Sequence, residues 1–288
     1  MKVKIGIHLM VWTANLQENL TSYFEEAKVA GFDGVEIPII DPMKLDFKIV
    51  KSLREALEKF DLECTCGGGL GREPSLIHEN INARKRGKEY LKRYVDICSD
   101  LSSNFLAGVL YGGFEVSLGR GRNKDEWSWA IEGIREVAEY AEARQVTLCL
   151  EAINRYETYF LNTAEDGVQL VKEIDKDNVK LHLDTYHMNI EEKDFYNPIV
   201  KSKRYLGYLH CSENDRGVPG TGHVNWDSIF RALSKTNYQG WLVIEGFLHP
   251  IKEIPIASSI WRPVAKSAEE VVVKGCRFIK AKVDEHNL

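Results

Sequence analysis

The sequence predicts a single (β/α)8 TIM barrel of the α/β class, with residues 1–288 forming one domain. Short segments rich in Val, Ile and Leu alternate with longer amphipathic segments along the whole chain. Eight apolar segments occur, and 288 residues divided among eight units gives 36 residues each, enough for one strand and one helix. The alternative fold is a doubly wound sheet, but no Gly-x-Gly-x-x-Gly motif follows the first apolar segment.

The expected strands are short and apolar on both faces, as parallel strands covered by helices are. Because right-handed crossovers join consecutive parallel strands, eight of them in series favour a closed barrel. In chain order the expected strands are Val3–Leu9, Gly34–Ile37, Glu63–Cys66, Phe105–Leu110, Val146–Glu151, Val179–Asp184, Leu206–Cys211 and Trp241–Glu245.

Helical patterns lie between these strands. Apolar residues recur at helical spacing over Tyr23–Ala30, and Gly31 is placed to end that helix. The same spacing over Trp129–Ala141 predicts a second helix. A third is expected over Val168–Ile174, with Thr163 as its N-cap and an aspartate three residues later.

Two segments interrupt the regular pattern, and both follow strands, on the side where barrel active sites are built. Gly67–Gly71 contains four glycines, which predict either a flexible loop or a turn that lines a substrate. Phe247–Val264 contains Pro250, Pro255 and Pro263, which delay the last helix.

The composition excludes several classes of partner. The formal net charge is −5 and no run of lysine and arginine exceeds three residues, so no nucleic-acid partner is expected. The start of the chain has no apolar signal core, and no uncharged apolar run approaches about 18 residues, so no membrane segment is expected. The six cysteines form no Cys-x-x-Cys pair, which is typical of small buried residues in a reducing compartment. We therefore expect a soluble, cytoplasmic protein.

Four polar residues end the last four expected strands. Glu151, Asp184, His210 and Glu245 are 33, 26 and 35 residues apart, close to one barrel unit each. Because the strands are parallel, their carboxyl ends meet at one rim, so the four side chains should converge there. His182 lies on the same face as Asp184, one layer deeper, and we expect it to be a core residue that supports the site.

Such a cluster favours a divalent cation. Each of the four residues alone is consistent with a salt bridge at the rim, but three carboxylates and an imidazole desolvated together need a shared positive charge. Carboxylate oxygens with one imidazole nitrogen suit Mn²⁺ or Mg²⁺, with Co²⁺ also compatible, and there is no thiolate to favour structural Zn²⁺. The sequence therefore predicts a metal site at the C-terminal ends of strands five to eight.

Longer motifs around these residues resemble the D-tagatose 3-epimerase family of ketose 3-epimerases, among the xylose-isomerase-like TIM barrels. The similarity covers essentially the whole chain and is densest from Glu151 to Phe247. The segments that carry it are Ile5–His8, Val11–Trp12, Glu151–Glu157, Leu161–Thr163, Leu181–Glu192, His210–Gly217, Pro219–Gly222, Glu245–Phe247 and Ile260–Arg262.

The resemblance implies an enzyme, an isomerase that epimerises free, non-phosphorylated ketoses at C3. It implies one divalent metal ion per subunit, most often Mn²⁺, held by Glu151, Asp184, His210 and Glu245. The two glutamates double as the acid/base pair, and family members form homodimers or homotetramers. Substrate contacts are implied around C1 to C3 of the sugar for Glu157, His187 and Arg216, and nearer its far end for His8, Trp12, Cys66 and Phe247. His8 departs from certain members, which have an aromatic residue there.

The chemistry explains these residue types. Inverting a carbon next to a ketone requires removing its C–H proton and returning one to the opposite face, so one base on each face is the minimal arrangement. The C–H acid is weaker than a glutamic acid by about 20 kcal/mol. A divalent metal reduces that gap by stabilising the cis-enediolate.

Other functions on the same scaffold are alternatives. Hydroxypyruvate isomerases and inosose dehydratases resemble the chain at the level of the fold, and a dehydratase needs only a leaving group β to the abstracted proton. Xylose isomerases use a second metal and a further ligand set, which we do not find in the sequence. Endonuclease IV binds DNA through a histidine-rich multi-zinc site, which the one histidine ligand and the net charge argue against. A non-catalytic sugar-binding protein is disfavoured because both glutamates are intact.

Overall fold

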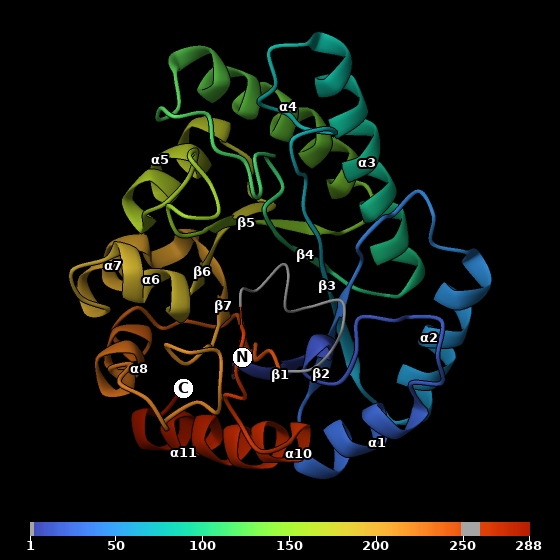
Figure 1. The fold of residues 1–288 in the computed structure, drawn as a ribbon, viewed down its shortest axis with the longest axis vertical. Helices are drawn as coiled ribbons and strands as arrows, with labels where there is room; N and C mark the ends of the chain where they lie inside the picture. The colour runs from blue at the N-terminus through green and yellow to red at the C-terminus, as the bar shows by residue number, and fades with distance from the viewer. Residues whose placement is uncertain (1–2, 249–259) are drawn as a thin grey trace.

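The computed structural model describes residues 3–248 and 260–288, and its strands close into one parallel barrel in the order β1 to β8 (Figure 1). All eight expected strands are confirmed, with ends that differ by at most two residues. They are β1 (Lys4–His8), β2 (Gly34–Pro38), β3 (Glu63–Gly67), β4 (Phe105–Gly108), β5 (Thr147–Ala152), β6 (Val179–Asp184), β7 (Leu206–His210) and β8 (Trp241–Ile244).

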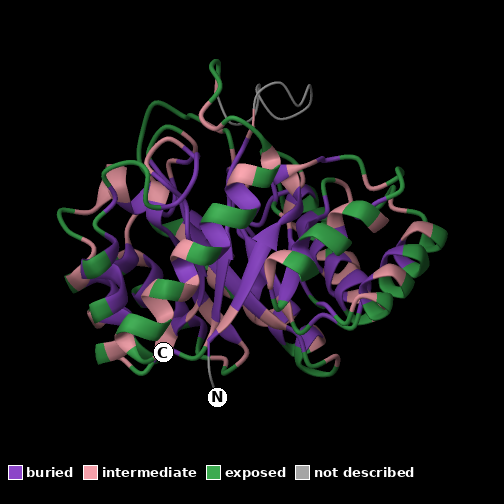
Figure 2. Ribbon diagram, turned by 90° about the horizontal axis from the view of Figure 1, so that it is seen from below, coloured by how far each residue is buried: buried purple, intermediate pink, exposed green. Residues whose placement is uncertain are grey.

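The helices surround the barrel, with their exposed faces turned outwards and the strands buried at the centre (Figure 2). They are α1 (Thr21–Ala30), α2 (Phe47–Lys59), α3 (Ile81–Asp100), α4 (Lys124–Glu142), α5 (Ala164–Ile174), α6 (Thr185–Glu191), α7 (Tyr196–Ser202), α8 (Trp226–Lys235), α10 (Ala268–Glu270) and α11 (Cys276–His286), with a π-helical turn at Val271–Gly275 and 3-10 turns at Leu9–Val11 and Lys203–Tyr205. The expected C-terminal end of α1 and the expected N-cap of α5 are both confirmed. Gly31 closes α1 with φ +94°, which suits glycine, and Thr163 caps α5 by accepting a hydrogen bond from the backbone N–H of Asp166.

The strand register places polar residues at the same height inside the barrel. Asp184 on β6 pairs with His210 on β7, and Glu36 on β2 pairs with Thr65 on β3. Deeper in the barrel, the inward residues form a separate apolar cluster that includes Tyr208. The carboxyl ends of the strands therefore carry polar groups above an apolar floor.

The glycine-rich segment after β3 is ordered against the strand next to it. The backbone N–H of Gly68 donates to Ala107 and that of Leu70 donates to Val109, at 3.0 and 2.9 Å. Gly67, Gly68, Gly69 and Gly71 all line the central cavity. The segment is therefore an ordered turn that lines the cavity, and its contact with a substrate stays a prediction.

The segment after β8 can be followed only in part. Pro250 and Pro255 lie outside the described residues, whereas Pro263 precedes α10, so the last helices begin late, as expected. Among residues 3–248 and 260–288, none of the helices combines the length and the apolar character needed to cross a bilayer.

Candidate active site

The four strand-end residues meet at the carboxyl ends of β5 to β8. Glu151, Asp184, His210 and Glu245 are all buried, and three of them line a cavity of about 500 Å³. Ligand atoms of Asp184, His210 and Glu245 lie within 4.8 Å of one another, and Glu151 forms a similar group with Asp184 and His187. The expected convergence on one rim is therefore confirmed.

His210 shows that this cluster suits a cation. Its Nε2 lies 2.8 Å from Glu36 Oε2, so that nitrogen has a partner. Its Nδ1 is buried without a hydrogen-bond partner and lies 3.4 Å from Glu245 Oε2 and 3.9 Å from Asp184 Oδ2. A divalent ion between this nitrogen and the two carboxylates would give the buried nitrogen the partner that it lacks. Carboxylate oxygens with one imidazole nitrogen suit Mn²⁺, Mg²⁺ or Co²⁺.

The environment separates the pKa values of the two glutamates. Burial raises the pKa of Glu151 well above its usual range, and the nearby carboxylates of Glu245 and Asp184 add to this rise. Burial acts in the same direction on Glu245, but the Arg216 guanidinium and His210 outweigh it and hold its pKa well below the usual range. Two carboxyl groups facing one cavity are thus pushed towards opposite protonation states, the pattern of an acid and a base.

Arg216 supplies the positive charge of the cluster. Its Nη1 donates to Asp184 Oδ2 at 2.5 Å, to the carboxylate of Glu245 and to Ser212 Oγ. The guanidinium is buried between the rings of Tyr186 and Phe247, at 4.0 and 5.1 Å from their centroids. Its backbone has φ +65°, a left-handed conformation that is uncommon outside glycine and often found at functional sites.

His187 faces the cluster from the start of α6. Its Nδ1 accepts a hydrogen bond from the backbone N–H of Asn154, so the neutral ring carries its proton on Nε2. That nitrogen lies 3.8 Å from Glu151 Oε1 and 3.9 Å from Asp184 Oδ2. The side chain of Asn154 also donates to Glu157 at 2.7 Å, which fixes this carboxylate on the cavity wall. His187 thus presents an N–H donor and Glu157 presents acceptor oxygens.

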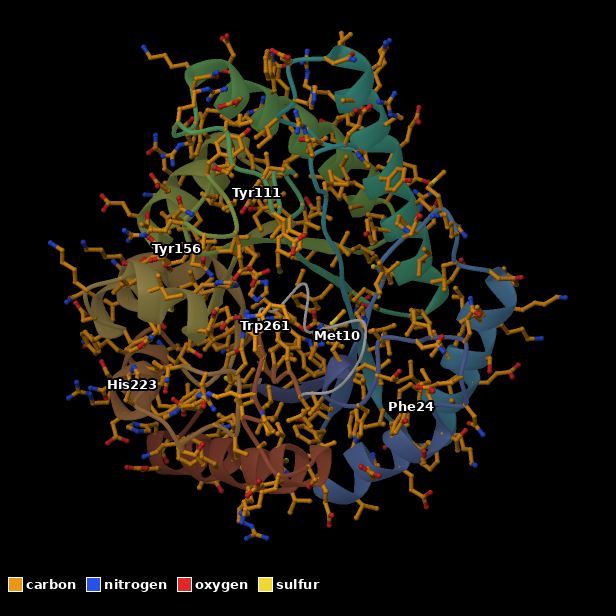
Figure 3. All side chains as sticks on the ribbon, viewed as in Figure 1. Met10, Phe24, Tyr111, Tyr156, His223 and Trp261 are labelled. Carbon is orange, nitrogen blue, oxygen red and sulfur yellow. The ribbon has the colours of Figure 1, made fainter. Side chains whose placement is uncertain are left out.

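His8 lies in a different place from the one expected. Its Nδ1 accepts from the backbone N–H of Met10, and its Nε2 lies 3.7 Å from Glu36 Oε1 and 4.0 Å from Glu245 Oε1. The ring therefore belongs to the polar half of the cavity, beside Glu245, rather than to the far end. Met10 itself lines the cavity and appears near the centre of the molecule in Figure 3.

The opposite half of the cavity is an apolar wall built by the last residue of β2 and by the segments that follow β2, β3 and β4. We define this apolar wall as Pro38, Ile39, Gly68, Val109 and Phe114. None of these side chains carries a hydrogen-bonding group. Phe247, one of the expected sugar contacts, lines the cavity as well, on the side of Arg216.

Two expected sugar contacts, Trp12 and Cys66, do not line the cavity. The indole N–H of Trp12 donates to Glu26 at 2.9 Å and its ring stacks on Tyr23, so it packs against α1. Cys66 follows Thr65, whose hydroxyl meets Tyr208 inside the barrel, and strand alternation therefore turns Cys66 outwards, towards the helices. Neither placement supports a contact with substrate.

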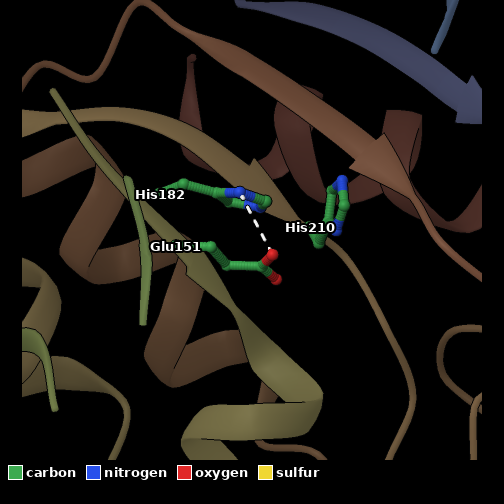
Figure 4. A group of neighbouring side chains, drawn as sticks. All are labelled: Glu151, His182 and His210. Atoms are coloured by element: carbon green, nitrogen blue, oxygen red, sulfur yellow. Dashed lines mark ion pairs between the residues drawn. The ribbon is translucent and has the colours of Figure 1, made fainter. Parts of the chain in front are cut away.

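His182 lies where the sequence suggested, and Glu213 orders the loop that follows β7. His182 is fully buried, with Nδ1 3.8 Å from Glu151 Oε2, and neither ring nitrogen has a hydrogen-bond partner (Figure 4). Glu213, which follows the strand end of His210, accepts from the backbone N–H groups of Gly220 and Val224 and so orders its own loop. Neither side chain lines the cavity.

Glu36 and Tyr186 also belong to the site, although the sequence motifs did not indicate them. Glu36 is a buried carboxylate on β2 that lines the cavity and partners His210. A signal was present, because Glu36 interrupts an apolar strand just as the other carboxylates do, although one residue before the expected end. Tyr186 follows Asp184 directly and stacks on Arg216, a contact that only the folded loops define.

The chain is similar in sequence and in structure to proteins of known family. Residues 24–282 match the model of the xylose isomerase-like TIM barrel family. A ketose 3-epimerase of Arthrobacter globiformis is 33% identical over 290 residues, which cover 98% of this chain and 97% of the relative. A D-psicose 3-epimerase of Ruminiclostridium cellulolyticum is 33% identical over 270 residues, which cover 93% and 92%. The crystal structure of a D-allulose 3-epimerase from Methylomonas sp. in complex with D-allulose matches with a TM-score of 0.92 and 28% identity, covering 98% and 97% of the two chains.

The closed barrel and its buried acids and histidine therefore define a xylose isomerase-like TIM barrel. Within that class, the chain belongs to the ketose 3-epimerase family. It is an isomerase that acts on carbohydrates, and the resemblance of the sequence motifs is confirmed.

Proposed function

We propose that the protein epimerises free ketoses at C3 through a cis-enediolate, with Glu151 and Glu245 as acid and base on opposite faces of the sugar. The observation that carries this proposal is the pair of buried glutamates that line one cavity, beside the other two strand-end residues. The names of the relatives, ketose 3-epimerase and D-psicose 3-epimerase, support the same reaction.

The proton transfers balance with these two groups alone. For a ketose whose C3 hydrogen faces Glu245, the ionised carboxylate takes that proton, and the electron pair of the C–H bond enters the C2–C3 bond while the carbonyl oxygen gains negative charge. Glu151, kept protonated by its raised pKa, then returns a proton to C3 from the other face. In the reverse direction the two residues exchange roles.

Glu151, Asp184, His210 and Glu245 would hold one divalent metal ion per subunit, and we propose Mn²⁺, with Co²⁺ or Mg²⁺ as substitutes. When bound, the ion would supply Lewis-acid stabilisation of the negative charge that the enediolate carries. The orphaned Nδ1 of His210 and the carboxylate oxygens around it support this assignment.

Three further side chains would orient the sugar. The Nε2–H of His187 and the Arg216 guanidinium are donors placed beside the acid/base groups, where negative charge develops on the sugar oxygens. Glu157 is an acceptor for a hydroxyl hydrogen, since Asn154 fixes its carboxylate on the cavity wall. Phe247 and the apolar wall would pack against the carbon face of the sugar.

The deciding experiment is isotope exchange. The Mn²⁺-loaded protein is incubated in D2O with D-fructose, D-tagatose or L-ribulose, and the sugars are followed by NMR. Deuterium at C3 together with the C3 epimer is the expected result. Exchange at C1 with aldose formation would instead identify an aldose–ketose isomerase, and loss of water from the sugar would identify a dehydratase.

We also propose that the chain assembles as a homodimer or homotetramer. This rests on the family alone, and light scattering of the purified protein measures it directly. A monomer at micromolar concentration would contradict it.

A further inference from the structure

Glu36 lines the cavity but has no part in the proton transfers proposed above. Its Oε2 accepts two hydrogen bonds, from His210 Nε2 at 2.8 Å and from the Tyr208 hydroxyl at 2.7 Å. Because the Tyr208 proton goes to Glu36, the hydroxyl of Thr65 must donate to Tyr208, over 2.6 Å. A chain of hydrogen bonds therefore runs from β3 to β7, then to Glu36 on β2, and ends at His210 on β7.

This chain determines which nitrogen of His210 faces the carboxylate cluster. An ionised carboxylate can only accept hydrogen bonds, so Glu36 keeps a proton on His210 Nε2. The lone pair available for a ligand is then on Nδ1, the orphaned nitrogen that faces Asp184 and Glu245.

Gly67 indicates that the position of Glu36 is fixed from its other side as well. A Cβ atom at residue 67 would lie 2.5 Å from Glu36 Oε1, so any larger residue would displace the carboxylate. At Gly69, in the same segment, the nearest atom to such a Cβ would be the backbone oxygen of Val109 at 3.5 Å, an ordinary contact. The two glycines therefore differ in what an alanine would disturb.

We propose that Glu36 is a positioning residue for His210. It orients the imidazole and fixes its tautomer, so that Nδ1 is preorganised to bind the divalent metal. Hydrogen bonds of this kind to a ligating histidine raise its basicity and typically change metal affinity by 10- to 100-fold. This inference rests on the metal-dependent function proposed above, and it adds a residue outside the four ligands.

The test measures the Kd of Mn²⁺ by isothermal titration calorimetry, without substrate, on the wild-type protein and on Glu36→Gln. The glutamine amide can donate to Nε2, which would transfer the ring proton to Nδ1 and remove the ligand lone pair. We expect the Kd to rise about 10- to 100-fold. Glu36→Asp keeps a carboxylate and should recover part of the affinity, a rescue that a purely structural role would not produce. Melting of the metal-free proteins records stability separately.

A pair of alanine variants tests the same inference without changing any charge. Gly67→Ala should raise the Kd of Mn²⁺ because it displaces Glu36, whereas Gly69→Ala should keep the wild-type value. These variants also decide the question if Glu36→Gln does not fold. A wild-type Kd in Glu36→Gln or in Gly67→Ala would overturn the role of Glu36. A wild-type protein that binds none of Mn²⁺, Co²⁺ and Mg²⁺ would instead refute the metal-dependent function itself.

Discussion

Arg216 donates through Nη1 to Asp184 Oδ2 over 2.5 Å, with both side chains buried. The same nitrogen contacts Glu245, so one guanidinium bridges two of the four carboxylate and imidazole groups that would hold a metal. Arg216 and the proposed metal ion would therefore compensate the same two negative charges.

The first prediction concerns this shared compensation. Arg216→Met leaves Asp184 and Glu245 as buried charges without their partner, which costs about 3–5 kcal/mol. We expect the Tm of the metal-free variant to fall by about 10 °C. Mn²⁺ should then raise the Tm of the variant more than that of the wild type, because the ion replaces the lost charge. Equal increments in scanning calorimetry would contradict this prediction.

The second prediction concerns the acid/base pair. Glu151→Gln and Glu245→Gln should each lower kcat about 10³-fold or more, since each removes the proton transfer on one face. The assay is epimer formation by NMR at saturating Mn²⁺. Glu269→Gln, an exposed glutamate on α10, is the matched control and should leave kcat unchanged. Substantial turnover in either active-site variant would exclude the two-base mechanism.

Removal of metal is the third prediction. Dialysis against a chelator should abolish epimerisation, and added Mn²⁺ or Co²⁺ should restore it, because the glutamate carboxylates alone are too weak to ionise the C–H bond. The circular dichroism spectrum should be retained throughout, as the barrel is closed by its own strands. Full activity in excess chelator would count against a metal enzyme.

The fourth prediction is that metal binding weakens as the pH falls. Burial lowers the pKa of His210, but Glu245 and Glu36 outweigh it and raise that pKa well above its usual value. His210 thus holds a proton on Nδ1 in the metal-free protein and must release it to a metal, so the affinity should rise with pH. Calorimetry in buffers of different ionisation enthalpy counts the released protons, and a count of zero would be inconsistent with this account.

The fifth prediction separates two aromatic residues of the sequence motifs. Trp12 packs on Tyr23 outside the cavity, so Trp12→Phe should leave KM within about twofold. Phe247 lines the cavity beside Arg216, so Phe247→Ala should raise KM about tenfold through lost packing against the sugar. The measurement is steady-state kinetics with one ketose. A large change of KM in Trp12→Phe would instead indicate that Trp12 contacts the sugar.

The strands and the four strand-end residues could be predicted because both follow from local patterns. Buried parallel strands read as short apolar segments, and a carboxylate at the end of such a segment is visible in the sequence itself. Asp184 and His210 then come together without further information, since neighbouring parallel strands end at the same rim.

The other contacts of the site could not be predicted, because they depend on how strands and loops pack against one another. The segment Glu63–Cys66 gives no indication which of Thr65 and Cys66 faces inwards, and the structure turns Cys66 towards the helices. Arg216 comes from a loop, and its place between Tyr186 and Phe247 arises only when the loops after three strands pack together. The sequence could have indicated Glu36 as a buried carboxylate, because it interrupts an apolar strand. Its pairing with His210 could not be predicted in the same way, since the two residues are far apart in the chain.

The division of the cavity into two halves has a consequence for how such enzymes diverge. The proposed acid/base groups come from the ends of β5 and β8, whereas the apolar wall lies at the end of β2 and after β2, β3 and β4. Substitutions in the wall could therefore alter which sugar fits while the reaction is preserved. Glu36 is the exception, because it stands in the half that is free to vary and yet touches His210 in the half that is not. Lineages that remodel the wall are therefore expected to retain this one carboxylate, and the glycine beside it, while the neighbouring positions drift.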